Sequence, residues 1–555
     1  MRVPFFGAIN REVRGMHQAA YVLAALALGS QLLALLRDRL LAATFGASHI
    51  LDLYYAAFRI PDFLFATIAS LLSLYALLPV LSRLEASQPG RMMTFLRGAL
   101  LFFFLAMGGI AIVLFFMTPW LALLIAPGIA GPSLILLMRI LLLQPILLGA
   151  SNTIASFTQL RHRFILYSIS PLLYNLGIIF GVLILYPLFG IAGLGWGVVL
   201  GAFFHLMVQV PFFSSESGQP MPWHDIAHAL KEVLTLSVPR TLALAANQIT
   251  LLVLVGLASV FAVGSIAVFM FAYNLQAVPL TLIGVSYSVA AFPTLARLHA
   301  NGQKEDFIRH IETALRHIFL WSIVATVFII VLRAQLVRVI LGAGAFDWTA
   351  TRLTAAALAL FILSLLAQNA SMLIDRVYFA AGNTIRPLLY GVSDVFFSIV
   401  SAFLFIFLFH AYPLLQEFVN ALLRVDDVQG TIVLTLAIAY AFGSIMQFLI
   451  SLFFFVRDFK VPLHSVWRLC FEIGSASIIG SSVSYLILAF IGSRINLNTT
   501  LGVLWQGTAA GIGGLIITLG ILWLLGNPEL QEAVIALRRR FVPDTTTLEP
   551  TDIAA

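Results

Sequence analysis

Long apolar runs recur along almost the whole chain, and this pattern constrains the fold more than any other feature. A transmembrane helix needs about 20 mostly apolar residues, and that criterion gives fourteen predicted spans. The runs lack the polar alternation of barrel strands, so they indicate helices. With 61% hydrophobic and 10% charged residues, the composition lies outside the range of soluble domains. The sequence predicts an all-α polytopic membrane protein with about 14 transmembrane helices. The predicted spans are Gln18–Leu36, Ile50–Leu81, Thr94–Met117, Ser133–Thr158, Phe164–Leu188, Ile191–Phe213, Val233–Ser259, Ser265–Leu295, Ile311–Leu332, Leu353–Ala380, Ile385–Leu408, Thr431–Val456, Cys470–Ile491 and Leu501–Leu525.

Three short motifs recur at nearly one spacing, which predicts an internal repeat. The motif pairs are PVLSRLEAS from Pro79 with PTLARLHAN from Pro293, LIAPG from Leu124 with ILGAG from Ile340, and PLLYN from Pro171 with PLLYG from Pro387. Six helices in each copy would give both copies the same orientation in the membrane. We therefore predict two six-helix lobes, at 1–213 and 233–456, joined by a cytoplasmic linker at 214–232. Helices 13 and 14 at 457–525 are appended, followed at 526–555 by an amphipathic cytoplasmic helix and a disordered tail from Asp544.

The distribution of basic residues predicts the orientation. Of the 31 lysines and arginines, 20 flank the spans on the side of the N-terminus and seven on the other side. By the positive-inside rule both termini are cytoplasmic. The sequence pI of about 9.6 then reflects topology, and no nucleic-acid partner is expected.

Catalytic and metal-binding patterns are missing from the sequence. Cys470 is the single cysteine, so neither an intrachain disulfide nor a cysteine metal cluster can form. We find no Walker loop, dinucleotide-binding loop or nucleophile elbow. We expect a protein that is not an enzyme and needs no cofactor, apart from possible coupling to Na⁺ or H⁺.

The stretch from Arg37 to Pro61 concentrates charge between two apolar segments. A charge within a membrane span costs roughly 2.5–3.5 kcal/mol on insertion scales, so it normally faces a partner or a wet cavity. The candidate ligand-binding residues here are Arg37, Asp38, Asp52 and Arg59. Arg37 and Asp38 could instead snorkel to the interface, and Arg59 could form an internal pair with Asp52 or Asp62.

Further candidates lie in the second lobe. Its matching stretch, VFMFAYNLQAVP, carries no charge but contains Asn274, which we expect near the same cleft. Arg240 follows Pro239 near the start of the seventh span and would add a guanidinium group. Asp394, an isolated carboxylate within a span, suits a coupling ion, with Asn247 and Thr250 as oxygen donors.

Prolines and glycines within the spans predict bends and close helix contacts. Pro61, Pro145, Pro171, Pro239 and Pro279 mark kinks. The segment GTAAGIGG, from Gly507 to Gly514, offers a small-residue face for close helix contact or a groove for a lipid chain.

The first two spans resemble the lipid II flippase family (MurJ/MviN) of the multidrug/oligosaccharidyl-lipid/polysaccharide exporter superfamily. The matching residues are Arg37, Asp38, Phe45, Gly46, Asp52, Ala57, Phe58, Arg59, Pro61 and Pro79. LSVPRTLALAANQI, from Leu236, is similar to the family's seventh helix. Where the family often has further arginines, this chain has Gln31, Phe65, Ala66 and Asn274, so we expect a less cationic cavity with Arg240 compensating.

The resemblance implies transport of a polyprenyl-pyrophosphate-linked saccharide, lipid II, from the inner to the outer leaflet for peptidoglycan synthesis. It implies a monomer working by alternating access, with arginines on the diphosphate and helices 13 and 14 guiding the lipid tail. The alternatives left open are export of another polyprenyl-linked oligosaccharide, cation-coupled drug efflux, and a membrane scaffold that does not transport.

Overall fold

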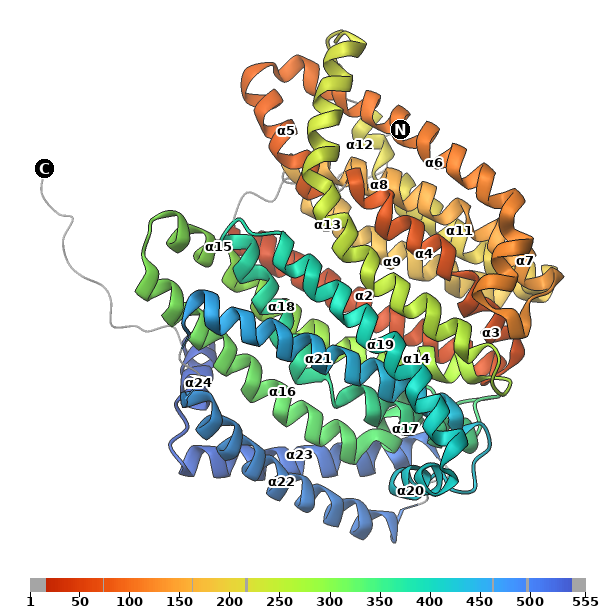
Figure 1. The fold of residues 1–555 in the computed structure, drawn as a ribbon, viewed down its shortest axis with the longest axis vertical. Helices are drawn as coiled ribbons and strands as arrows, with labels where there is room; N and C mark the ends of the chain where they lie inside the picture. Colours follow the sequence, from red (N-terminus) through yellow and green to blue (C-terminus); the bar gives the residue numbers. More distant parts are fainter. Residues whose placement is uncertain are drawn as a thin grey trace, which may run out of the picture. The chain divides into compact units, whose positions relative to one another are not determined.

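The structure, a computed structural model, describes residues 16–72, 74–161, 163–214, 218–461, 464–495 and 499–541. All regular secondary structure in these ranges is helical (Figure 1). The first half contains α2 (Met16–Phe45), α3 (His49–Ala57), α4 (Arg59–Thr67), η1 (Ala69–Leu72), α5 (Leu74–Ser87), α6 (Pro89–Ile125), η2 (Pro127–Ile129), α7 (Pro132–Leu141), α8 (Leu143–Leu160), α9 (Phe164–Phe180), η3 (Gly181–Leu185), α10 (Tyr186–Phe189), α11 (Ile191–Met207), α12 (Val210–Ser214) and α13 (Trp223–Ala258). The second half contains α14 (Ser265–Pro279), η4 (Leu280–Val285), α15 (Ser286–Ala300), α16 (Lys304–Ile340), α17 (Trp348–Ile362), α18 (Leu365–Ala380), α19 (Ile385–Ala411), α20 (Pro413–Leu423), η5 (Thr431–Val433), α21 (Leu434–Phe459), α22 (His464–Gly492), α23 (Thr500–Leu524) and α24 (Pro528–Phe541).

Every predicted span overlaps one or more of these helices. Among the described residues, nine helices are long and apolar enough to cross a membrane, or ten if α17 and α18, bent by 44°, form one span. Two shorter apolar helices, Ile191–Met207 and Ala245–Ala258, add to these. The all-helical membrane class is therefore confirmed, while the count of fourteen spans stays a prediction.

Two of the predicted proline kinks coincide with helix breaks. Pro61 has no N–H for the carbonyl group of Ala57, and α3 ends at Ala57. Pro145 likewise leaves the carbonyl group of Leu141 without its helical donor, and α7 ends at that residue. By contrast, α9 continues through Pro171. The breaks divide long spans into shorter helices that can turn their side chains inward.

The chain divides into two compact units. The first comprises Met1–Val278, Val337–Ser364 and Gly382–Ser451, and the second comprises Pro279–Leu336, Leu365–Ala381 and Leu452–Ala555. In the first unit, buried side chains of α5, α6, α8 and α13 pack against one another and form an apolar core, which includes Phe95, Phe103 and Phe157. Glycines let α9 and the following η3 approach α11 closely: Gly177 of α9 meets the backbone of Gly201, and Gly181 of η3 meets that of Gly197.

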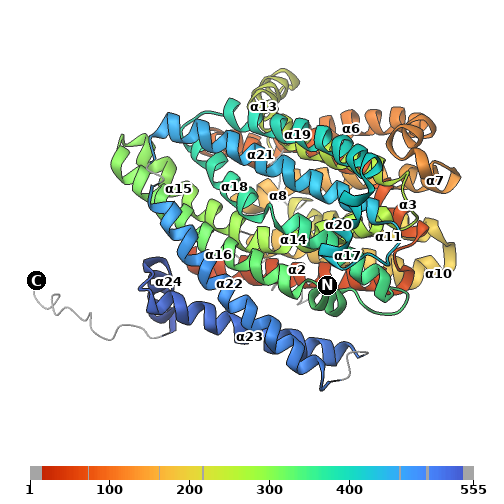
Figure 2. The ribbon, with the colours of Figure 1, turned by 60° about the horizontal axis from the view of Figure 1, so that its bottom comes forward.

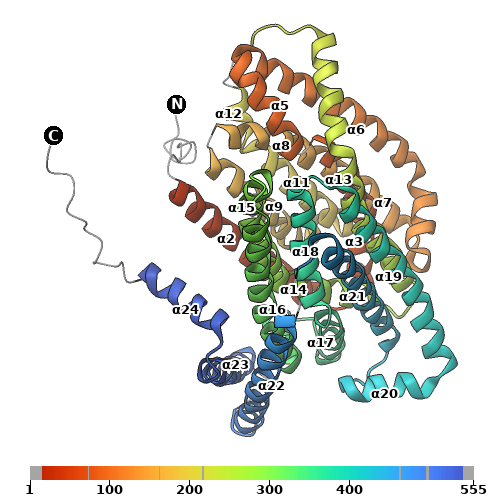
Figure 3. The same ribbon diagram turned by 60° about the vertical axis from the view of Figure 1, so that its left-hand side comes forward.

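In the second unit, α22 and α23 run side by side (Figures 2 and 3). Gly514 lies against the carbonyl oxygen of Gly480 and the hydroxyl group of Ser484, so the predicted small-residue face does form a close helix contact. α24 is bound to α16 by two carboxylates: Glu529 pairs with Arg316, and Glu532 lies 3.1 Å from the Nε2 atom of His317. The predicted disordered tail, Asp544–Ala555, lies outside the described residues.

Equal helix lengths agree with the internal repeat. α6 and α16 each contain 37 residues, and they occupy corresponding places in the two predicted copies. The boundaries of the predicted lobes stay a prediction.

Candidate substrate-binding site

A cavity of about 200 Å³ in the first unit gathers most of the predicted ligand-binding residues. We call it the charged cavity. Its walls come from α2, α3, α4, α8, α9 and α14. It is lined by Arg37, Asp38, Leu41, Tyr54, Tyr55, Phe58, Arg59, Asp62, Gln144, Tyr174, Ile178, Met270 and Asn274.

On α2, Arg37 and Asp38 form one half of the charge network. The Nε and Nη2 atoms of Arg37 donate to Oδ1 of Asp38 at 2.9 and 2.8 Å, and Nη1 donates to Asn175 at 3.0 Å. Asn274 of α14 donates to the other carboxylate oxygen of Asp38 at 3.2 Å. The carboxylate of Asp38 therefore joins α2 to α14.

Arg59 and Asp62 form the other half, just after the break at Phe58. The guanidinium group of Arg59 is almost fully buried, and its Nη2 atom lies 3.4 Å from Asp62. Its Nε atom donates to the carbonyl oxygen of Tyr55 at 3.2 Å. Within the described part of the chain, its Nη1 atom has no hydrogen bond. The internal pair that the sequence left open is thus formed with Asp62, and the four charges of the cavity sum to zero.

Asp52 lies elsewhere and does not line the charged cavity. Its carboxylate accepts hydrogen bonds from the backbone N–H groups of Gly264 and Ala267, at 2.6 and 2.9 Å. These groups lie at the amino end of α14, where free N–H groups and the helix dipole favour an anion. Asp52, a candidate ligand-binding residue and a possible partner of Arg59 in the sequence, therefore makes a capping contact with α14.

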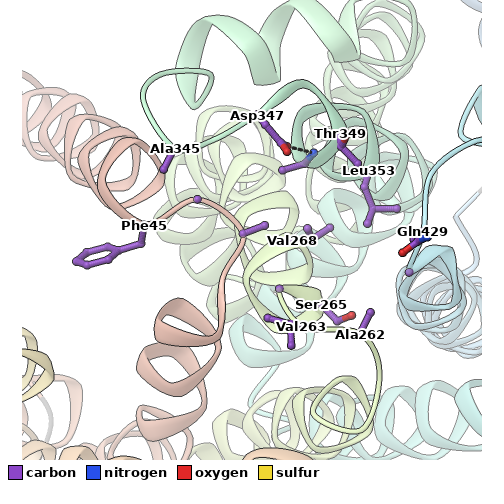
Figure 4. A pocket seen from close by; sticks show the side chains of 15 residues that line it. Phe45, Ala262, Val263, Ser265, Val268, Ala345, Asp347, Thr349, Leu353 and Gln429 are labelled. Atoms are coloured by element: carbon purple, nitrogen blue, oxygen red, sulfur yellow. Dashed lines mark hydrogen bonds between the residues drawn. The ribbon is translucent and has the colours of Figure 1, made fainter.

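A second hollow of about 220 Å³, which we call the loop pocket, lies where four loops meet (Figure 4). Asp347 accepts a hydrogen bond from the N–H of Ala350 there, at the start of α17. The pocket is lined by Phe45, Gly46, Ala47, Ala262, Val263, Gly264, Ser265, Val268, Ala345, Asp347, Thr349, Ala350, Leu353, Gln429 and Gly430.

Backbone contacts close the loops around this pocket. The N–H of Ala345 donates to the carbonyl oxygen of Ala43 at 2.8 Å. Gly46, Gly264 and Gly344 all have positive φ values. Gly46 and Gly264 each lie against a carbonyl group of another loop, and Gly344 lies against the carbonyl group of Ala43, near the end of α2. A Cβ atom at Gly46 would lie 2.6 Å from the carbonyl oxygen of Ala345. These contacts require glycine both for backbone conformation and for space.

The remaining candidates are dispersed. Asp394 of α19 is buried and accepts a hydrogen bond from Ser444 at 3.3 Å. Thr250 is fully buried and its hydroxyl group has no partner among the described residues, while Asn247 is exposed. No hydrogen bond in the described part of the chain joins Asp394 to either of them. Arg240 lies within α13, and its side chain is outside what the structure describes.

Sequence reasoning missed several polar groups in the cavity wall. Gln144 is buried and donates to the hydroxyl group of Tyr174 at 3.2 Å, while its own carbonyl oxygen and the hydroxyl group of Tyr55 have no partner among the described residues. The sequence offered one sign of this polar wall: Gln144 is an amide next to Pro145 within an apolar span. The tyrosines could not be separated from ordinary core aromatics. Among the described residues there is no group of three or more side chains suited to hold a metal ion.

Comparisons with known proteins agree with this architecture. Residues 41–492 match the family model described as lipid II flippase MurJ. The probable lipid II flippase MurJ of Buchnera aphidicola subsp. Acyrthosiphon pisum is 28% identical over 364 residues, which are 63% of this chain and 70% of that relative. The probable lipid II flippase MurJ of Aquifex aeolicus is 26% identical over 435 residues, covering 76% of this chain and 84% of the relative.

Solved structures share the fold. A lipid II flippase MurJ in an inward closed conformation has a TM-score of 0.69 at 22% identity, covering 91% of this chain and 99% of the other. An inward-facing multidrug resistance MATE family transporter of the MOP superfamily has a TM-score of 0.63 at 14% identity, covering 78% and 94% of the two chains. Because the family model covers well over half of the sequence, the chain belongs to the lipid II flippase MurJ family.

Proposed function

We propose that this protein moves lipid II from the inner to the outer leaflet of the bacterial plasma membrane. Two relatives that match most of its length are named as probable lipid II flippases. The single observation that carries the proposal is the charged cavity, which is lined by Arg37 of α2, Arg59 of α4 and Asn274 of α14. The function would serve peptidoglycan synthesis, and through it the cell wall and cell shape.

The two arginines suit a diphosphate because guanidinium groups present several donors in a rigid plane. Asp38 and Asp62 hold the two arginines in place and balance their charge. A diphosphate would compete for the same donors, and the two carboxylates would keep the arginines oriented through their remaining contacts. Asn274 and Gln144 offer neutral hydrogen-bonding groups beside them.

The size of the cavity supports a mechanism of alternating access. At about 200 Å³, it is smaller than typical pockets for drug-sized ligands, which measure about 300–1,000 Å³. A disaccharide peptide therefore needs an open state to enter. We assign the loop pocket to the outer end of the pathway, where the backbone contacts of its loops would close the exit until the substrate is bound.

We propose Asp394 as the group that couples transport to a Na⁺ or H⁺ gradient, with Thr250 and Asn247 as further oxygen donors. The burial of the Asp394 carboxylate and the unpartnered hydroxyl group of Thr250 support this role. The transport cycle would need no covalent step and no other cofactor. The protein would act as a monomer with both termini in the cytoplasm.

The direct test is rescue of a bacterium depleted of its own lipid II flippase. We expect the native protein to restore growth, and Arg37→Ala or Arg59→Ala to abolish rescue at equal membrane abundance. Arg309→Ala, which removes an exposed arginine that lines neither the charged cavity nor the loop pocket, is the matched control and should rescue. Rescue by both arginine variants would contradict the proposed diphosphate grip.

The alternatives predict different outcomes of the same experiment. A native protein that is abundant in the membrane but gives no rescue favours another polyprenyl-linked oligosaccharide as cargo. Cation-coupled drug efflux predicts protection against toxic organic cations, which should require Asp394. A scaffold predicts that Arg37→Ala and Arg59→Ala both retain function, because its partners would bind the loops and the tail.

A further inference from the structure

The short helix α20 has its polar and apolar faces reversed with respect to a helix on a soluble protein. It follows α19 directly and turns sharply away from the axis of that helix (Figures 1 and 3). Its polar side faces the protein: the amide groups of Gln416 and Asn420 both donate to the hydroxyl group of Thr431, at 3.2 Å each. Thr431 begins η5, at the entry to α21.

The opposite side of α20 is apolar and uncovered. Leu414, Phe418 and Leu422, spaced by four residues, have exposed fractions of 79%, 65% and 67%. This spacing places the three side chains in one stripe along the helix. Such a stripe is unfavourable in water, whereas it is typical of helices that lie in the interface of a bilayer.

The apolar stripe continues the membrane-facing surface of α19. Phe403 and Phe407 of α19 are 56% and 64% exposed, and Tyr412, 60% exposed, lies at the junction with α20. The apolar surface runs from the span α19 onto α20, which lies across the end of that span. Along this path it would contact first the lipid chains and then the head groups. Tyrosine is enriched at that level of the membrane. Glu417 is exposed at the edge of the stripe, where a charge can reach water.

Ion pairing fixes α20 to the rest of the first unit. Arg424 ends the helix in the left-handed conformation, with φ 62°. Arg352 of α17 donates to the carbonyl oxygen of Arg424 and to both carboxylate oxygens of Asp427. Gln429 and Gly430, which follow Asp427 by two and three residues, line the loop pocket. α20 is thus held to the loops of that pocket by a short, hydrogen-bonded connection.

We propose that α20 is an in-plane anchor that buries Leu414, Phe418 and Leu422 in the outer leaflet of the membrane. The anchor sets the depth of the loops that line the loop pocket. Its occupant is the lipid bilayer, because the stripe is continuous with the lipid-facing side of α19 and carries no charge. The alternative is that a protein partner covers the stripe, and the experiment must distinguish a protein from the bilayer.

Site-directed spin labelling in lipid vesicles tests the proposal without any substrate. Cys470→Ser removes the single cysteine, and a nitroxide is then attached at Phe418→Cys, with Leu414→Cys as a second position on the stripe. Glu417→Cys, on the adjacent residue, is the matched control. We expect labels at 414 and 418 to collide preferentially with oxygen, which dissolves in lipid, and the label at 417 with a water-soluble nickel complex.

Two results would overturn the anchor. Labels at 414 and 418 as accessible to the nickel complex as the label at 417 would place the stripe in water. Protection of both stripe positions from oxygen and nickel alike would show that protein covers it. The size-exclusion profile of each labelled variant must match that of the Cys470→Ser parent, and a stripe label that disturbs folding is replaced by the label at the other stripe position.

Discussion

Among single residues, Asp38 links two sides of the charged cavity. It accepts from Arg37 through one oxygen and from Asn274 through the other. The carboxylate therefore both neutralises an arginine and joins two helices that are distant in sequence. Its removal should leave a guanidinium group that needs another anion.

We predict that Asp38→Asn lowers the stability of the substrate-free protein by about 1–3 kcal/mol, the usual cost of losing a charged hydrogen bond in a buried place. An isoprenoid diphosphate should then stabilise the variant more than the native protein, because it supplies the missing negative charge. Thermal unfolding in detergent, with and without the ligand, measures both effects. An equal ligand-induced shift in the two proteins would contradict the idea that Asp38 and the diphosphate compete for Arg37.

Asp52 gives a second prediction at this scale. Because Asp52 caps α14 from another helix, Asp52→Ala should weaken the closed loops by about 0.5–2 kcal/mol, the range for losing a helix cap. That corresponds to a roughly 2- to 30-fold larger open population. The readout is maleimide labelling of Val268→Cys, a buried position in the loop pocket, on a Cys470→Ser background. Unchanged labelling would show that the cap does not hold the loops shut.

At the scale of helices, the close packing of α9 on α11 depends on glycine. Gly197→Ala would place a methyl group on the Cα atom of Gly181, and overpacking of this kind costs about 1–3 kcal/mol. Gly108→Ala in α6 is the control, because no atom lies within 4 Å of the added methyl group. We expect a lower unfolding temperature for Gly197→Ala alone. Equal unfolding temperatures for the two variants would contradict the close contact.

The connection from α20 to α17 should depend on pH. Arg352 donates to Asp427 and thereby lowers the pKa of that carboxyl group below its ordinary value of 3.8. A depressed pKa stabilises the folded state above the unfolded-state value, and this contribution disappears as the pH falls through the folded-state value. The difference in unfolding temperature between native protein and Asp427→Asn should therefore be constant from pH 8 to about 5, begin to fall near pH 4, and vanish only below the folded-state pKa, which is lower than 3.8. Asp426→Asn, next to it in the sequence, should show a smaller difference throughout.

Elements were more predictable from the sequence than the site was. Apolar runs located the helices, and Pro61 and Pro145 located two breaks, because a missing N–H acts on its own chain segment. The partner of Asp52 could not be foreseen, since it is the amino end of a helix more than 200 residues away. The choice of Asp62 as partner for Arg59 was one of two that the spacing allowed. The apolar outer face of α20 was not predicted, because that helix is shorter than a membrane span and lies between two predicted spans.

At the scale of the whole molecule, the distribution of charge predicts which loops face the cytoplasm. Asp426 and Asn301 are both exposed. A cysteine introduced at either position of the Cys470→Ser protein should react differently with a maleimide added to intact cells. We expect an impermeant maleimide to label the cysteine at 426 and to label the one at 301 only after the inner membrane is permeabilised. The reverse pattern would invert the proposed topology, and with it the direction of transport.

The glycine contacts around the loop pocket have a practical consequence. Gly46, Gly264 and Gly344 meet carbonyl groups directly. Glycine has no side chain to remove, so these contacts can be changed only by a substitution that adds atoms. A single methyl group at Gly344 would act as a wedge against the backbone of Ala43. A series of increasingly large side chains at this one position would keep the loops apart and stabilise a short-lived open state of the pathway.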